Sequence, residues 1–193
     1  MEVTQEVKIG SKISNWYTEN GRQNLPWREN VTPYRIWISE IMLQQTQVNT
    51  AIDYFNRFMA KYPDLETIKD ANEDDIYSLW SGLGYYRRAS YIYRAKEAIH
   101  ANFSGRMPEQ YKDIISLPGI GRSTAGAILS IAFNKPYPIL DANVKKVISR
   151  IFYKNSYEEK SFWELSEQML DKKNLFKFQQ GVMDLGSQIC LPK

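Results

Sequence analysis

The longest regular pattern of hydrophobic and polar positions falls between Trp37 and Tyr62. Apolar residues recur there at three-, four- and seven-residue spacings, which is typical of an amphipathic helix. Pro33 lies shortly before this stretch and Pro63 follows it, and proline often borders helices. The pattern predicts one helix over residues 37–62, whose apolar positions include Ile41, Val48, Ile52, Phe55 and Met59.

Helical signals continue along the rest of the chain, and strand alternation is absent. Asp74 and Asp75 would lie in the first turn of one helix, where the helix dipole favours acidic side chains. The short apolar pieces 137–140 and 151–153 are too isolated to form a sheet. Further helices are predicted over residues 72–81, 88–102, 109–116, 123–133, 142–153, 161–171 and 178–189. The expected fold class is all-α.

The composition is that of a folded domain and not of a disordered chain. Hydrophobic residues make up 43% of the 193 residues, enough for one large domain or two small lobes. No apolar run reaches the roughly 18 residues of a membrane span, and the first residues lack a signal-peptide pattern. The single cysteine, Cys190, excludes an internal disulfide and fits a reducing, cytoplasmic setting.

Basic residues are only slightly in excess, with a net charge of +3, so charge alone says little about partners. Local clusters are either solvated helix faces or phosphate contacts. In residues 85–88, two tyrosines precede two arginines, which suits a surface that stacks on bases and neutralises phosphate. The other clusters are Arg94 with Lys96, and Lys145 and Lys146 with Arg150.

The most informative segment joins two predicted helices through the turn Leu-Pro-Gly-Ile-Gly at residues 117–121. Gly119 and Gly121 permit backbone angles that side chains disfavour, and they leave the amides uncovered. Several N–H groups at a helix N-terminus can bind an anionic oxygen without reading base sequence. Arg122 could add a charge-assisted contact. The alternative is an ordinary helix–turn–helix connection with a glycine cap.

Two acidic residues are candidates for chemistry, and each has a simpler alternative. Asp141 precedes an amphipathic stretch, where aspartate commonly caps a helix. Glu40 borders an apolar face near Trp37 and Leu43, although most such glutamates are merely solvated. A half-buried carboxyl group favours its neutral form, as a general acid requires near neutral pH. The polar run at residues 44–47 is either a solvated face or a set of side chains that probe base edges.

Four segments together resemble the MutY-type adenine DNA glycosylases of the helix-hairpin-helix, or endonuclease III, superfamily. The segments are residues 25–28 (LPWR), 39–47 (SEIMLQQTQ), 80–89 (WSGLGYYRRA) and 117–128 (LPGIGRSTAGAI), supported by residues 138–144 (PILDANV). The resemblance implies a two-lobed fold with the active site in the cleft between the lobes. A six-helix bundle would span residues 28–135, with the helix-hairpin-helix at 111–133. The second lobe would combine residues 1–27 with 136–193.

The resemblance implies base excision repair, in which adenine mispaired with 8-oxoguanine or guanine is removed from double-stranded DNA. Cleavage of a purine N-glycosidic bond is limited by a poor leaving group and a cationic sugar, so two carboxyl groups are useful. Glu40 would protonate adenine and later help activate water. Asp141 would stabilise the sugar cation, with Asn143 hydrogen-bonded nearby. Because the base must leave the duplex, intercalating side chains are expected.

The same resemblance assigns residues to DNA and to the base. Gln45 and Tyr85 would wedge into the base stack. Carbonyl groups in the hairpin, here those of Ile115, Leu117 and Ile120, often bind a monovalent cation in the superfamily. The expected DNA-binding residues are Gln44, Gln45, Thr46, Tyr85, Leu117, Gly119, Gly121 and Arg122. The expected adenine pocket is lined by Leu25, Trp27, Arg28 and Gln180.

Ser123 distinguishes hydrolysis from strand cleavage. Relatives such as endonuclease III carry lysine at this position, whose amine attacks the sugar, whereas serine cannot form a Schiff base. We therefore expect a monofunctional hydrolase with at most weak lyase activity, for which Lys145 or Lys146 would substitute inefficiently.

The chain departs from the family pattern after Cys190, which fits the first of four cysteine ligands of a [4Fe–4S] cluster. One cysteine cannot hold that cluster, and the family's C-terminal domain, which helps recognise oxidised guanine, is also missing from this sequence. We expect a shortened form of a longer enzyme, and a natural minimal form is the alternative. Cys190 itself would otherwise be a lone buried thiol.

Two rival functions stay open beside the adenine glycosylase. A glycosylase for thymine or uracil opposite guanine shares the hairpin and the aspartate, but it has less use for an acid aimed at a purine nitrogen. A non-catalytic DNA-binding module would keep the hairpin and perform no chemistry. In the favoured case a monomer acts on DNA in the bacterial cytoplasm, associated with the nucleoid. His100, the only histidine, is expected on a helix surface and not as a ligand.

Overall fold

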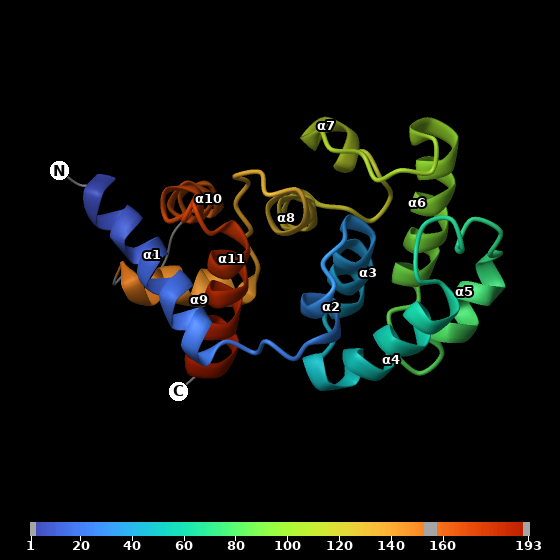
Figure 1. The fold of residues 1–193 in the computed structure, drawn as a ribbon, viewed down its shortest axis with the longest axis horizontal. Helices are drawn as coiled ribbons and strands as arrows, with labels where there is room; N and C mark the ends of the chain where they lie inside the picture. Colours follow the sequence, from blue (N-terminus) through green and yellow to red (C-terminus); the bar gives the residue numbers. More distant parts are fainter. Residues whose placement is uncertain (1–2, 153–157, 191–193) are drawn as a thin grey trace. The chain divides into compact units, whose positions relative to one another are not determined.

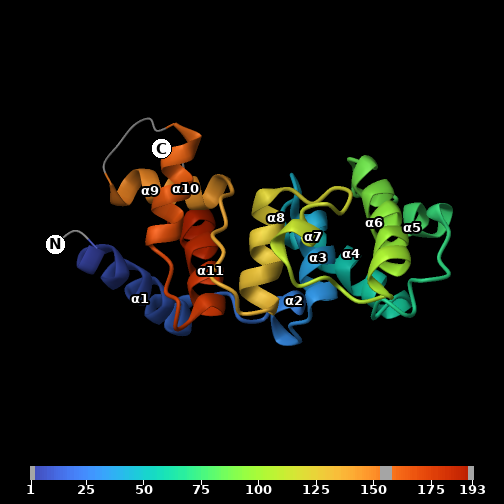
Figure 2. The same cartoon turned by 90° about the horizontal axis from the view of Figure 1, so that it is seen from above.

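The computed structural model describes residues 3–152 and 158–190, which form helices joined by loops (Figures 1 and 2). No strand occurs among these residues, so the predicted all-α class is confirmed. The chain divides into two compact units. Unit 1 comprises residues 1–23 and 129–193, and unit 2 comprises residues 24–128. The sequence placed the corresponding boundaries at residues 28 and 135.

Unit 2 is built around α3, whose buried face supplies much of its core. The tryptophan and isoleucine side chains at positions 36–38 and Ile41 are at most 1% exposed. Tyr34, at the start of this helix, donates a hydrogen bond of 2.9 Å to the carbonyl of Tyr62. The described helices of this unit are α2 (Pro26–Glu29), α3 (Pro33–Leu43), α4 (Val48–Lys61), α5 (Glu73–Trp80), α6 (Arg87–Phe103), α7 (Tyr111–Ile114) and α8 (Arg122–Ala127).

The predicted single helix over residues 37–62 is wrong, because the chain breaks between α3 and α4. Gln45 lies in this break with a φ of 56°, in the left-handed region. The buried guanidinium of Arg88 donates to the carbonyls of Ile41 and Met42. In a continuous helix those carbonyls would accept from amides four residues further on. A side chain from α6 therefore takes the place of the backbone donors, and α3 ends.

The next two predicted helices are confirmed as α5 and α6. Asn72 and Asp75 form a capping box at the start of α5, since the Asp75 amide donates to Asn72 Oδ1 at 2.8 Å and the Asn72 amide to Asp75 Oδ2 at 3.2 Å. Such a box satisfies two helix-end donors at once. At the C-terminal end of α6, the capping residue Ser104 adopts a left-handed conformation with a φ of 52°. The helix predicted over residues 109–116 is shorter and is confined to α7.

Unit 1 is a helical cluster that contains one helix the sequence did not predict, α1 (Val3–Asn20). This helix packs along α11 (Leu175–Asp184) (Figure 1). The rings of Tyr17 and Phe176 meet edge to face with their centroids 6.1 Å apart. The remaining helices are α9 (Ala142–Ile151) and α10 (Glu159–Gln168), while π-helical turns form at η1 (Ile128–Ala132) and η2 (Leu185–Ile189). The predicted stretches 142–153, 161–171 and 178–189 correspond to α9, α10, and α11 with η2, although Tyr153 lies outside the described residues.

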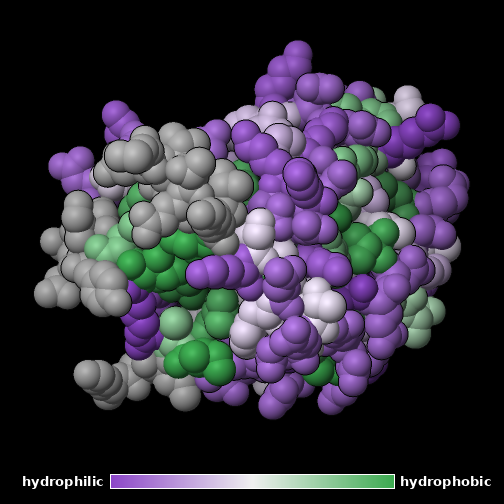
Figure 3. Space-filling view, turned by 60° about the vertical axis from the view of Figure 1, so that its left-hand side comes forward, coloured by the Kyte–Doolittle hydropathy of each residue, from purple (hydrophilic) through white to green (hydrophobic). Residues whose placement is uncertain are grey.

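The core of unit 1 is apolar, and part of it reaches the surface. Buried members include Val144, Trp163 and Phe178, and the partly buried Phe152 and Phe162 pack against them. Figure 3, which turns this unit forward, shows hydrophobic residues gathered among otherwise hydrophilic surface. None of the described helices is long and apolar enough to cross a lipid bilayer.

A buried ion pair closes unit 1. The carboxylate of Asp184 is fully buried, and it accepts from the Arg22 amide at 2.9 Å, from Nε at 2.9 Å and from Nη2 at 2.5 Å. Arg22 Nη2 also donates to Ser187 Oγ at 3.0 Å. The end of the N-terminal segment is thereby attached to the end of α11 through a charge that water does not reach.

Replacement of Arg22 tests how much this pair holds the unit together. We expect Arg22→Met to lower the free energy of unfolding by roughly 3–5 kcal/mol, because the buried carboxylate of Asp184 loses the positive charge and the two guanidinium donors. Arg22→Lys should recover part of the loss, since it restores the positive charge but not the planar pair of donors that the guanidinium presents to Asp184. The matched control is Lys160→Met, because Lys160 is 84% exposed and 3.9 Å from Glu164; its effect should stay within about 0.5 kcal/mol. Urea denaturation followed by circular dichroism measures all three, and equal effects of the two methionine variants would contradict the account.

Candidate active site

The predicted hairpin connects α7 to α8, and two buried side chains anchor it. Leu117 and Ile120 are 3% and 5% exposed, and the Ile120 amide donates to the Leu117 carbonyl at 3.2 Å. Leu117 therefore serves the turn through packing and through its backbone, and its side chain is not available to DNA. Arg122 is exposed at the first position of α8.

The two glycines of the hairpin play different parts. Gly119 has a φ of 78°, and a Cβ at this position would lie 2.5 Å from Cβ of Tyr91 in α6. Only a hydrogen atom fits there, so Gly119 permits both the turn and the contact with α6. Gly121 caps α8 with extended backbone angles, and no atom lies within 4 Å of the position a Cβ would take. The amides that begin α8 are thus left uncovered by a side chain at residue 121.

The two predicted wedge residues are exposed and share an uncommon backbone conformation. Gln45 has a φ of 56° and Tyr85 a φ of 49°. Tyr85 is 61% exposed, which is unusual for so large an aromatic side chain. Gln44 and Thr46, on either side of Gln45, are half-buried. An aromatic side chain that points into solvent from a strained backbone is a common feature of binding sites.

Glu40 lies on α3, in unit 2, at the border that the sequence predicted. It is half-buried, while Trp37, one turn before it, is fully buried. The next residue, Ile41, is also fully buried. The carboxyl group therefore belongs to the edge of an apolar helix face and not to a fully solvated one.

Asp141 lies at the start of α9, in unit 1, and both of its carboxylate oxygens have donors. Oδ1 accepts from the Val144 amide at 2.7 Å, and Oδ2 accepts from Asn143 Nδ2 at 3.2 Å. The helix-cap interpretation of Asp141 is confirmed. The cap does not exclude chemistry, because the same two bonds fix the orientation of a half-buried carboxylate.

Asn143 is in turn held by a close contact with the π-helical turn η2. A Cβ added to Gly186 would lie 2.4 Å from the Asn143 carbonyl oxygen and 2.5 Å from its Cβ. Lys146 Nζ donates to the Gly186 carbonyl at 2.9 Å and joins the same two elements. A glycine at residue 186 is thus required for η2 to lie against the helix that presents Asp141 and Asn143.

The candidate pocket residues divide between the two units. Trp27 is 3% exposed and meets the Phe55 ring edge to face at 5.4 Å. Leu25 and Arg28, at either end of the same short turn, are 7% and 8% exposed, and the Arg28 amide donates to the Leu25 carbonyl at 2.7 Å. Gln180 belongs to α11 of unit 1 and is 2% exposed. The structure brings Leu25, Trp27 and Arg28 together within unit 2.

The two remaining candidate residues, Ser123 and Cys190, are both partly buried. Ser123 is half-buried in the first turn of α8. Cys190 follows η2, is partly buried, and packs against the apolar core of unit 1. Among the described residues no group of cysteine, histidine, aspartate and glutamate side chains is arranged to hold a metal ion. His100 is half-buried, and its Nε2 lies 2.9 Å from the Leu65 carbonyl, so its ring is engaged with the backbone.

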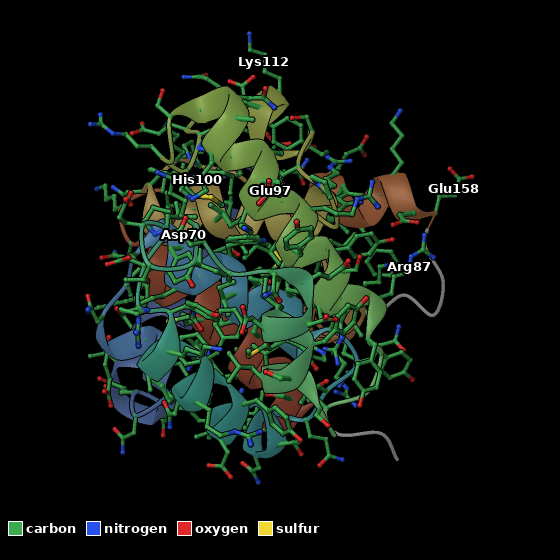
Figure 4. All side chains as sticks on the ribbon, turned by 90° about the vertical axis from the view of Figure 1, so that its right-hand side faces the viewer. Asp70, Arg87, Glu97, His100, Lys112 and Glu158 are labelled. Atoms are coloured by element: carbon green, nitrogen blue, oxygen red, sulfur yellow. The ribbon has the colours of Figure 1, made fainter. Side chains whose placement is uncertain are left out.

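Sequence reasoning missed the role of Arg88, which it grouped with Arg87 in a basic cluster. Arg87 is exposed at the beginning of α6, and Figure 4 shows it projecting away from the ribbon. Arg88 is only 5% exposed. Helical spacing could have indicated that Arg88 is buried, because it lies four and seven residues before apolar positions on the same face. The buried residues of α6 are Arg88, Ala89, Ile92, Ala95, Lys96 and Ile99.

Comparison with known proteins now identifies the family. Residues 38–169 match the HhH-GPD superfamily of base excision DNA repair proteins. The chain belongs to this superfamily. It is 48% identical over 184 residues to an adenine DNA glycosylase of Buchnera aphidicola, a match that covers 93% of this chain and 53% of the relative. The chain thus spans about half the length of the curated relatives that it matches.

Solved structures share the fold of this chain. A thermostable thymine-DNA glycosylase superposes with a TM-score of 0.88 at 29% identity, covering 100% of this chain and 91% of that chain. An endonuclease III in a non-covalent DNA complex superposes with a TM-score of 0.78 at 16% identity, covering 96% and 86% of the two chains. The predicted helix-hairpin-helix glycosylase fold is confirmed.

Substitution of each hairpin glycine separates its packing role from its role towards DNA. We expect Gly119→Ala to lower the free energy of unfolding by about 1–3 kcal/mol, because the methyl group meets Tyr91 and the backbone is left-handed. Gly121→Ala should change stability by less than about 0.5 kcal/mol, since space is open there. It should nevertheless weaken binding to duplex DNA, because the methyl group partly covers the amides.

Thermal denaturation and fluorescence anisotropy with a labelled duplex measure these two effects. If Gly119→Ala is as stable as the parent, the contact with α6 does not constrain the turn. If Gly121→Ala binds duplex DNA as tightly as the parent, the hairpin amides do not hold phosphate.

Proposed function

We propose that this protein is a monofunctional adenine DNA glycosylase of base excision repair, which hydrolyses the N-glycosidic bond of adenine opposite 8-oxoguanine or guanine. The observation that carries the proposal is the 48% identity with an adenine DNA glycosylase over nearly the whole chain. The helix-hairpin-helix and the two acidic residues at α3 and α9 are consistent with it. Double-stranded DNA is the proposed partner, and the exposed Gly121 and Arg122 are the proposed contacts with its backbone.

Glu40 is the proposed proton donor. Adenine leaves poorly as an anion, and protonation of a ring nitrogen by a carboxyl group makes it a better leaving group. The half-buried place of Glu40 next to fully buried Trp37 limits water around the carboxyl group. After the base departs, the resulting carboxylate can accept a proton from the attacking water.

Asp141 is the proposed stabiliser of the sugar. As the bond to the base breaks, positive charge develops on the deoxyribose ring, and a fixed carboxylate lowers the energy of that state. The hydrogen bonds from Val144 and Asn143 hold the carboxylate in one orientation before the substrate arrives. A group oriented in advance needs no reorganisation during the reaction.

Hydrolysis leaves an abasic site and an intact strand. Strand cleavage by the superfamily's bifunctional members needs an amine that forms a Schiff base with the sugar. Ser123, at the first turn of α8, carries a hydroxyl group and cannot form one. The proposal therefore assigns the chemistry to water and not to a covalent amine intermediate.

The residues present do not fit a [4Fe–4S] cluster. Such a cluster takes four thiolate ligands, and this chain has a single cysteine, Cys190, which packs against the core of unit 1. No step of the proposed reaction passes through the cluster. The residues proposed to act on adenine and sugar all lie within the chain described here.

A second candidate function is excision of thymine opposite guanine. It is favoured by the similarity to a thymine-DNA glycosylase, which extends over the full length of this chain. The 29% identity of that match is lower than the 48% identity with the adenine enzyme. The two candidates differ in the base released, so an assay of base release distinguishes them.

Single-turnover assays with Glu40→Gln test the function and its proton donor together. The parent and the variant are mixed in excess with duplexes that contain A opposite 8-oxoguanine, A opposite guanine, or T opposite guanine. We expect the parent to release adenine and leave the strand intact until hot alkali cleaves the abasic site. Loss of the acid should slow adenine release by about 10²–10⁴-fold. Thymine release by the parent would support the second candidate, and equal rates for parent and variant would exclude Glu40 as the donor.

Two replacements at Asp141 separate its cap from its chemistry. We expect Asp141→Asn to lower the free energy of unfolding by less than Asp141→Ala does, because its Oδ1 still accepts from the Val144 amide although its Nδ2 no longer accepts from Asn143. Asp141→Ala should lower it by about 1 kcal/mol. Both variants lose the charge, so both should excise adenine about 10²–10³-fold more slowly. Denaturation and single-turnover rates measure the two properties, and an active asparagine variant would leave Asp141 with only its structural role.

A further inference from the structure

One buried guanidinium binds two separate backbone segments of unit 2. Arg88 is 5% exposed and donates to six backbone carbonyls. Three belong to the end of α3 and the residue that follows it: Ile41 at 3.1 Å, Met42 at 2.6 Å and Gln44 at 2.7 Å. Three belong to the loop before α6: Leu83 at 3.5 Å, Gly84 at 3.0 Å and Tyr85 at 3.4 Å.

Each of these segments carries one residue with a strained backbone. Gln45 directly follows the bound Gln44 carbonyl and has a φ of 56°, while Tyr85 itself has a φ of 49°. A residue other than glycine in this region costs on the order of 1–3 kcal/mol and persists only where its surroundings hold it. Both side chains are exposed, so packing of their own side chains does not explain the strain. Arg88 donates to the carbonyl directly before each strained residue, those of Gln44 and Gly84, and Trp80 Nε1 adds a second bond of 3.2 Å to the Gly84 carbonyl.

A buried cation of α6 does not by itself need such an arrangement. Lys96, two turns further along α6, is also buried, at 2% exposure, and it donates to a single carbonyl, that of Lys69 at 2.6 Å. Its charge is balanced by Glu97 at 2.6 Å. Arg88 instead spreads its donors over two segments, and burial lowers the pKa of its guanidinium. The planar fork of an arginine can reach both segments at once, whereas an ammonium group is a single point charge.

We propose that Arg88 is a positioning residue that couples Gln45 and Tyr85, so that the two side chains enter the base stack as one rigid unit. This inference rests on the proposed function, which assigns both residues to the distortion of DNA around the mispair. Side chains held in their working conformation before binding lose less conformational entropy on binding, which increases the affinity for the distorted duplex. Arg88 touches neither the base nor the sugar in this scheme and acts only through the two loops.

The test measures recognition of the mispair without turnover. In a Glu40→Gln background, dissociation constants are determined for duplexes with A opposite 8-oxoguanine or T opposite guanine, and for the matched duplex with T opposite A. The preference for the mispair is expressed as the ratio of the dissociation constant of the matched duplex to that of the duplex with A opposite 8-oxoguanine. We expect Arg88→Gln to reduce this ratio by about tenfold, which corresponds to about 1.4 kcal/mol. Arg88→Lys should lose less, because it keeps the charge and part of the hydrogen bonding. If the glutamine variant does not fold, the lysine variant decides the same comparison.

Two controls distinguish positioning from a general loss of stability. Lys96→Gln removes a buried cation from the same helix and should leave the ratio unchanged at a temperature where all variants are folded. The second control combines Arg88→Lys with Gln45→Ala and Tyr85→Ala. If Arg88 acts through these two side chains, its replacement should reduce the ratio no further once both are gone.

Each outcome decides the inference. A drop in the ratio that disappears in the combined variant supports it. An unchanged ratio, an equal drop with Lys96→Gln, or a drop that adds fully to the loss of Gln45 and Tyr85 overturns it. If the parent prefers the duplex with T opposite guanine, the proposed substrate is wrong, and the same comparison on that duplex still tests Arg88. A parent that prefers no mispair overturns both proposals.

Discussion

The carbonyl groups at the end of α3 must be satisfied inside unit 2, where water does not replace missing donors. A helix leaves its last carbonyls without intrahelical partners. Arg88 supplies donors to those of Ile41 and Met42, and it reaches them from α6. The chain can then turn at Gln45 and begin α4. The length of α3, the direction of the following loop and the exposed place of Gln45 therefore depend on one side chain that is distant in sequence.

At α9, one carboxylate meets a structural requirement and is proposed to meet a chemical one as well. The start of a helix needs an acceptor for its first amides, and Asp141 provides it to Val144. The bond from Asn143 occupies the second oxygen, and Gly186 allows η2 to lie against Asn143. The orientation of the carboxylate thus depends on α9, which supplies both donors, and on η2, which lies against Asn143. A group held so firmly is suited to stabilise charge that appears at one place during a reaction.

Much of the fold follows from local sequence signals, and the departures have physical causes. The capping residues Asn72 and Asp141 and the glycines of the hairpin mark helix ends that the structure confirms. The break between α3 and α4 was not predictable from periodicity, because apolar residues continue in phase across it and the cause lies in Arg88. The helix α1 was missed from local periodicity, and the contacts that hold it come from α11, where Tyr17 meets Phe176 and both Ile13 and Tyr17 lie against Gly181. The proposed roles of Glu40 and Asp141 came from sequence motifs. The structure adds that Glu40 is half-buried and that both oxygens of Asp141 accept hydrogen bonds.

The fold by itself does not select the base that is released. A thymine-DNA glycosylase shares it with a TM-score of 0.88, so the same fold is found in an enzyme named for a pyrimidine and in a chain proposed to release a purine. Stabilisation of the sugar by a carboxylate is also common to both reactions, since both pass through a cationic sugar. What differs is the leaving group, because a purine gains more from protonation at a ring nitrogen. In the proposed reaction, specificity for adenine should therefore depend on the acid at Glu40 and on the side chains around the base, and the proposed phosphate binding and wedging of the stack should decide whether the base reaches them.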